Sequence, residues 1–132
     1  MKYMLLMHGS ERVDASPIHT WSPADVAAHI QFMQDTNAKL VADGEFVNAQ
    51  GLSGPEEARV VRAGRDGTPE VTDGPFPESK EFLAGYWVID VENQDRAIEV
   101  AAAISLAPGP GGAPLHLPIE VRQVMSAPLT EA

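Results

Sequence analysis

The 132-residue chain contains no cysteine. This absence excludes disulfides, thiolate zinc sites, iron–sulfur clusters and cysteine nucleophiles. It is consistent with a cytoplasmic protein, because disulfides are rare in that compartment. Long apolar segments are also missing at the N-terminus, where the run Tyr3–Met7 ends at His8. Such a run is too short for the core of a signal peptide or for a membrane span. We therefore expect a cytoplasmic location and no contact with a membrane.

Basic residues are scarce. Nine lysines and arginines stand against 19 acidic residues, which gives a net charge of −10, and no two basic residues are adjacent. A protein that binds DNA or RNA needs a basic face to displace counterions from the phosphates. The composition therefore argues against a nucleic-acid partner, and the acidity is also what keeps a cytosolic protein soluble.

Motifs for the common catalytic and cofactor sites are absent as well. The chain has no Ser-His-Asp order, phosphate loop, dinucleotide fingerprint or metal signature. None of its four histidines has a second one three or four residues away, the spacing that binds a metal on a helix. We therefore expect neither a metal nor a cofactor.

What remains is an ordinary globular composition, with 44% hydrophobic and 21% charged residues. A chain of this length fits one domain with a proper core. We expect residues 1–126 to form that domain and residues 127–132 to be a loose tail.

The sequence pattern predicts six strands and two helices. Apolar alternation and aromatic content place strands at residues 2–8, 46–52, 58–63, 71–73, 82–91 and 119–125. Ser22 and Pro23 open the first helix with a capping-box-like signal completed by Asp25, and Gly44 ends it. Asn93 caps the second helix. The expected apolar stripes are Val26, Ile30, Met33, Leu40 and Val41, interrupted by Asn37, and Ala97, Ile98, Ala101 and Ile104.

This order predicts an α+β, ferredoxin-like sandwich with a mostly antiparallel sheet and both helices on one face. The strands at 2–8 and 82–91 are apolar on both faces, so the second face of the sheet also needs cover. The simplest cover is another copy of the chain, packed sheet to sheet across a two-fold axis, which predicts a homodimer. The alternative is that the Gly/Pro-rich loop 106–118 folds under the sheet of a monomer.

Four blocks of sequence resemble one known family. Asp73-Gly74-Pro75-Phe76, an abrupt turn between Val71 and Glu81, matches the signature of the DGPF-domain proteins, a branch of the YCII-related family. The other blocks are Lys2-Tyr3-Met4-Leu5-Leu6-Met7, Gly85-Tyr86-Trp87-Val88-Ile89-Asp90-Val91 and Ile119-Glu120-Val121-Arg122-Gln123-Val124. The resemblance spans Lys2 to Met125 and implies a dimeric α/β-barrel fold.

The resemblance brings no known reaction. An enzymatic role with a histidine and an aspartate has been suggested for some YCII-related members. Some relatives are associated with extracytoplasmic-function sigma factors. The loop from Pro108 to His116 is unusually rich in glycine and proline and departs from the family's common pattern, so the resemblance does not identify the ligand.

Asp73, His8 and His116 are the candidate catalytic residues. Asp73 is either a general base or an acceptor that holds the turn through backbone amides. His8 ends the first strand and His116 lies in the crossover loop, so the fold can bring them to Asp73. A His–Asp pair would transfer protons near neutral pH, whereas the alternative is separate surface or hydrogen-bonded histidines.

Lys80, Glu81 and Arg122 are the candidate ligand-binding residues. Lys80 either binds an anionic group or pairs with an acid such as Asp73. Arg122 either points into a cleft and binds a carboxylate through two hydrogen bonds, or pairs with Glu120 or another acid.

Two functions follow from these candidates. In the first, a homodimer binds a small polar or anionic molecule in a sheet-edge cleft, with or without cofactor-independent acid–base catalysis. In the second, the chain is a regulatory interaction module that acts with a sigma factor. The turn from Asp73 to Glu81 would then be its docking surface.

Overall fold

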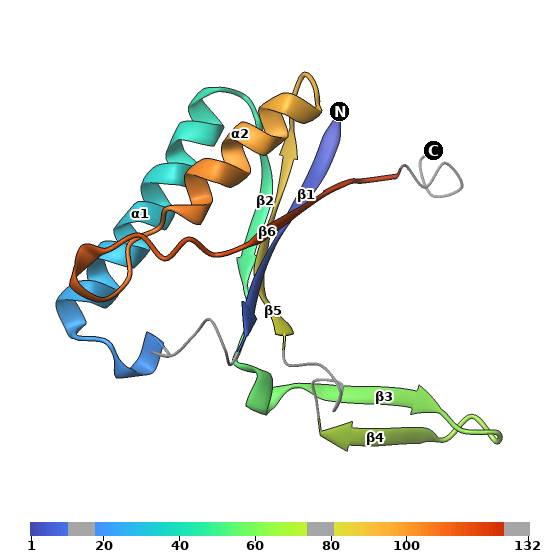
Figure 1. Ribbon diagram of the computed structural model, residues 1–132. Coiled ribbons are helices and arrows are strands. Elements are labelled where there is room, and N and C mark those ends of the chain that lie inside the picture. The colour runs from blue at the N-terminus through green and yellow to red at the C-terminus, as the bar shows by residue number, and fades with distance from the viewer. Residues whose placement is uncertain (11–17, 74–80, 126–132) are drawn as a thin grey trace.

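The computed structural model describes residues 1–10, 18–73 and 81–125 of the chain (Figure 1). The expected tail lies outside these residues. The elements in chain order are β1 (Lys2–Ser10), η1 (Ile18–Thr20), α1 (Pro23–Ala42), β2 (Phe46–Gly51), η2 (Pro55–Glu57), β3 (Arg59–Ala63), β4 (Pro69–Asp73), β5 (Glu81–Asp90), α2 (Gln94–Ser105), η3 (Pro110–Gly112) and β6 (Ile119–Gln123). Each predicted strand and helix is therefore present, with ends within about two residues of those expected.

Four of the strands form one sheet in the order β2-β5-β1-β6, and all neighbours in it are antiparallel. Both helices cover the same face of this sheet (Figure 1). This arrangement is two interleaved β-α-β units, and it confirms the α+β, ferredoxin-like prediction. The short strands β3 and β4 do not join the sheet but pair with each other in a separate hairpin.

Helix α1 begins and ends at the residues that the sequence indicates. The side-chain oxygen of Ser22 accepts a hydrogen bond from the amide of Asp25 at 3.2 Å. Gly44 follows the helix with φ of +72°, a conformation that glycine adopts without strain. The Asp25 carboxylate does not close the expected capping box, since it accepts from the amide of Gly111 at 3.2 Å.

The core lies between the helices and the sheet. Its buried side chains come from β1, β5, the segment after β5, α1 and α2, and they are Tyr3, Leu5, Leu40, Trp87, Ile89, Val91, Ala97, Val100, Ala101 and Ile104. Asn37, which interrupts the apolar stripe of α1, accepts a hydrogen bond from the indole nitrogen of Trp87 at 2.8 Å. The polar residue therefore satisfies the one polar atom of the Trp87 side chain.

Three apolar side chains that the helical spacing placed in the core are exposed. Ile98 is 50% exposed, and Val100 is buried in its place. The reason is geometric, because Ala97, Val100, Ala101 and Ile104 follow i, i+3, i+4, i+7 spacing and Ile98 lies one position beyond that face. On α1, Ile30 and Val41 are also exposed, so this helix buries less of its stripe than expected.

The Gly/Pro-rich loop 106–118 packs beside α1. The ring nitrogen Nδ1 of His29 donates to the carbonyl of Pro108 at 3.0 Å, and Asp25 accepts from Gly111. Figure 1 shows this loop on the helix side of the sheet. The loop therefore does not cover the opposite sheet face, contrary to the alternative in which it folds under the sheet of a monomer.

An ion pair joins Glu45, the residue before β2, to the first turn of α2. Arg96 donates three hydrogen bonds of 2.8 to 3.2 Å to the Glu45 carboxylate, whose side chain is only 15% exposed. These bonds lower the pKa of Glu45 below its ordinary 4.5. Because the two residues are far apart in sequence, the pair fixes α2 relative to the α1–β2 connection.

We predict that Glu45→Gln lowers the free energy of unfolding by about 1–2 kcal/mol near pH 7. A carboxyl group whose pKa is lower in the folded state than in the unfolded state stabilises the fold at pH values above its unfolded-state pKa. This contribution is lost as the pH falls through the folded-state pKa, which lies below 4.5. Urea denaturation should therefore show the gap between wild type and variant closing in acid. Glu99→Gln is the matched control, because Glu99 also pairs with Arg96 but is 68% exposed; an equal loss in both variants would contradict the prediction.

Candidate functional site

The sheet face opposite the helices, here called the open face, is the candidate site. The strand register arranges its side chains in two rows, each crossing β2, β5, β1 and β6 in turn. The rows are Asn48–Val88–Met4–Arg122 and Gln50–Tyr86–Leu6–Glu120. Each row has apolar or aromatic side chains on the two central strands and polar or charged side chains on the two edge strands.

The central part of the open face is only partly covered. Met4, Leu6, Tyr86 and Val88 all have intermediate exposure, whereas Leu5 and Ile89 on the helix-facing side are fully buried. Tyr86 has a polar neighbour at the β2 edge, since the amide of Asn48 donates to its hydroxyl at 3.4 Å. The two-faced apolar character expected of the central strands is therefore present.

A histidine and a carboxylate meet at the β6 edge of the open face. Nε2 of His8 donates to Oε1 of Glu120 at 3.0 Å, and both side chains remain accessible to solvent. The pair forms because His8 follows Leu6 on the same face of β1, and Glu120 lies directly opposite Leu6. A carboxylate that holds one ring nitrogen leaves the other nitrogen to accept or donate a proton.

Arg122 is two residues beyond Glu120 on β6 and shares this edge. It is exposed, and it lies opposite Met4 in the register. The open face therefore carries His8, Glu120 and Arg122 along one edge, next to an apolar centre. Such an edge has the groups needed to hold an anion and to move a proton.

Asp73 lies elsewhere. It ends β4 in the separate hairpin, its side chain is 92% exposed, and it pairs with Arg59 at 3.5 Å. Among the interactions of the described residues, none joins Asp73 to His8 or to His116. Lys80 lies outside the described residues, as does the side chain of Glu81. Most of the proposed docking turn is outside them too.

His116 is exposed in the segment that leads to β6, and its φ of +52° is in the left-handed region. Two residues later, the carbonyl of Pro118 accepts a hydrogen bond from the His8 amide at 3.5 Å. The backbone therefore passes close to His8 just after His116. The site residue that the sequence analysis missed is Glu120, because its link to His8 depends on the register between β1 and β6.

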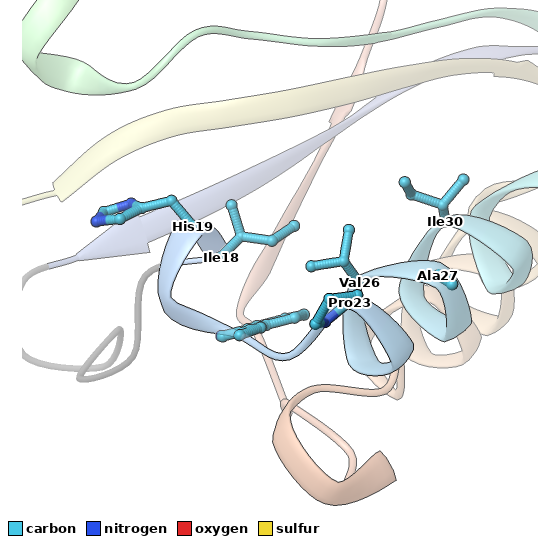
Figure 2. A pocket seen from close by; sticks show the side chains of 7 residues that line it. Ile18, His19, Pro23, Val26, Ala27 and Ile30 are labelled. Carbon is cyan, nitrogen blue, oxygen red and sulfur yellow. The ribbon is translucent and has the colours of Figure 1, made fainter.

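An apolar depression that the sequence did not indicate lies elsewhere, at the start of α1 (Figure 2). Its volume is about 540 Å³, and it is lined by Ile18, His19, Trp21, Pro23, Val26, Ala27 and Ile30. Val26 and Ile30 point the same way from successive turns of the helix, with His19 at the far end (Figure 2). Trp21 stands edge-on to His29, with ring centroids 5.4 Å apart. Of the predicted site residues whose side chains the structure describes, none lines this depression.

The described part of the chain holds neither a metal cluster nor a membrane-spanning helix. In residues 1–10, 18–73 and 81–125, no group of three or more histidines and acids is placed to hold a metal ion. No helix within the same ranges is long and apolar enough to cross a membrane.

Two comparisons with known proteins place the chain in a family. An uncharacterised protein of Rhizobium meliloti (strain 1021) is 29% identical over 107 residues, which are 81% of this chain and 82% of that protein. The family model of the YCII-related domain matches residues 1–112, which contain both α-helices and every strand of the described chain except β6. The chain therefore belongs to the YCII-related domain family.

Proposed function

We propose that the protein is a homodimer that binds a small anionic organic molecule between the open faces of two copies. The observation that carries this proposal is the composition of the open face, apolar on β1 and β5 and polar at both edges. Apolar side chains at the centre favour association, and polar side chains at the rim remain for a ligand.

The helices and the loop leave this face to a partner. Burial of apolar surface contributes about 25 cal/mol per Å², and a stable interface buries about 800 Å² on each side. The open face supplies the apolar centre of such an interface through β1 and β5. Association through it would close the pair of sheets into the dimeric barrel that the family resemblance implies.

The edge formed by His8, Glu120 and Arg122 gives the compartment its chemistry. Arg122 binds a carboxylate or phosphate group of the ligand, since a guanidinium donates two parallel hydrogen bonds to such groups. His8 exchanges a proton with the ligand, and Glu120 orients its ring. In this proposal Glu120 takes the part that the sequence analysis assigned to Asp73, and the reaction class is acid–base chemistry without a cofactor.

The first prediction concerns the dimer. We expect sedimentation at micromolar concentration to give twice the 14.1 kDa chain mass. Leu6→Lys should give the monomer, because it places a charge in the apolar centre of the open face. Ile98→Lys should leave the dimer unchanged, because Ile98 is exposed on α2 on the other side of the sheet. A wild-type chain that sediments as a single copy would overturn the proposed function.

The second prediction concerns the ligand. In a thermal-shift screen of small carboxylates and phosphates, we expect at least one compound to raise the melting temperature of the wild type. Arg122→Gln should weaken its binding by about tenfold or more, because the main charged contact is lost. The dimer should remain.

Lys39→Gln is the matched control for this screen, because it removes one positive charge from exposed α1. His8→Gln tests the acid–base step separately, and we expect it to abolish turnover while binding persists. Equal binding by wild type and Arg122→Gln would remove Arg122 from the site.

A further inference from the structure

Within the described chain the β3–β4 hairpin is exposed on both faces, with Val60 the one strand residue of intermediate exposure, and one face carries its most exposed valines. Its register pairs Arg59 with Asp73, Val61 with Val71 and Ala63 with Pro69 on that face. The other face carries Val60 with Thr72 and Arg62 with Glu70. The first face, here called the valine face, exposes 61% of Val61 and 56% of Val71, although these two side chains are directly opposite each other.

An isolated two-stranded hairpin is marginally stable in water. This one is ordered over five residues in each strand, and its two central valines gain little from each other when both remain exposed. A partner that covers the valine face would supply the missing burial.

The hairpin is also on the side of the sheet where a partner would sit. In Figure 1 the helices lie on one side of the four-stranded sheet. The hairpin projects from the lower end of the sheet toward the other side. It leaves the sheet where the amide of Leu52 donates to the carbonyl of Ala84 at 2.9 Å. His8 pairs with Leu83, so the hairpin begins at the same end of the sheet as the His8–Glu120 edge.

Charge favours a second copy of this chain as the occupant. Two copies that each carry a net charge of −10 repel each other over most of their surface. Residues 59–65, which are β3 and the start of its turn, hold three of the nine basic residues of the chain and no acidic residue. With the turn and β4 included, residues 59–73 hold three basic and three acidic residues, so the hairpin is neutral and meets less repulsion from an acidic copy than the net charge of −10 implies.

We propose that the β3–β4 hairpin is an arm that packs its valine face on the second copy of this chain and closes the compartment between the two open faces. The inference rests on the proposed dimer. The Arg59–Asp73 pair lies at the base of the valine face and becomes part of the compartment wall, so each copy completes the site with residues of the other. This placement gives Asp73 a position at the site that a single chain does not provide.

Val71→Glu and Thr72→Glu form a matched pair for the test. Both add one negative charge to the same exposed strand, but on opposite faces of the hairpin. We expect Val71→Glu to raise the dissociation constant of the dimer by about tenfold or more relative to Thr72→Glu, measured by sedimentation across a dilution series.

A labelling experiment covers the case in which Val71→Glu disturbs the hairpin itself. The chain has no cysteine, so Val71→Cys and Thr72→Cys each introduce a single thiol. We expect a maleimide to modify Cys at position 71 several-fold more slowly at concentrations where the protein is dimeric than after dilution to monomer. The thiol at position 72 should react at nearly the same rate under both conditions.

The outcomes separate this inference from the proposed function. A dimer that Val71→Glu weakens no more than Thr72→Glu does, with equal labelling at both positions, overturns the arm and leaves the open-face dimer standing. A wild-type chain that is monomeric overturns both. Weaker association of Val71→Glu together with protection at position 71 supports the arm.

Discussion

The two central strands of the sheet are apolar on both faces, and the rest of the architecture follows from how each face is covered. Tyr3, Leu5, Trp87 and Ile89 are buried under the helices on one side. The alternating positions on the other side are only partly covered within the described chain. A ferredoxin-like unit has only two helices, and in this topology both cross on the same side. The fold therefore leaves one side of the sheet without helices. This sequence adds apolar side chains to that side.

Sequence was sufficient where the signal is local. Ser22, Gly44 and Asn93 predicted helix ends because capping and left-handed termination depend on a few adjacent residues. Sequence was weaker where position depends on a neighbouring element. Ile98 satisfied an apolar pattern, yet the sheet lies against the face that contains Val100. Alternation within one strand is again a local pattern, and it agrees with the placement of Glu120 and Arg122 on the same side of β6.

Register is the quantity that sequence could not supply, and the candidate site depends on it. A shift of one residue between β1 and β6 would move Glu120 to the other face and remove its hydrogen bond to His8. The pairing of β3 with β4 was equally hidden, because two short strands fit either an extended sheet or a separate hairpin. The expected closeness of Asp73 to the histidines assumed a single sheet, whereas the chain places Asp73 on the hairpin.

In the proposed dimer, different parts of the open face would serve association and ligand binding. The groups suited to a ligand are on β6 and at the end of β1, outside the apolar centre. Their exposure in one chain leaves a bound anion in water, where an arginine contact is weak and screened. Covering the centre with a second copy would exclude water beside the edge and strengthen the same contact. Ligand binding should therefore depend on association, while association need not depend on the ligand.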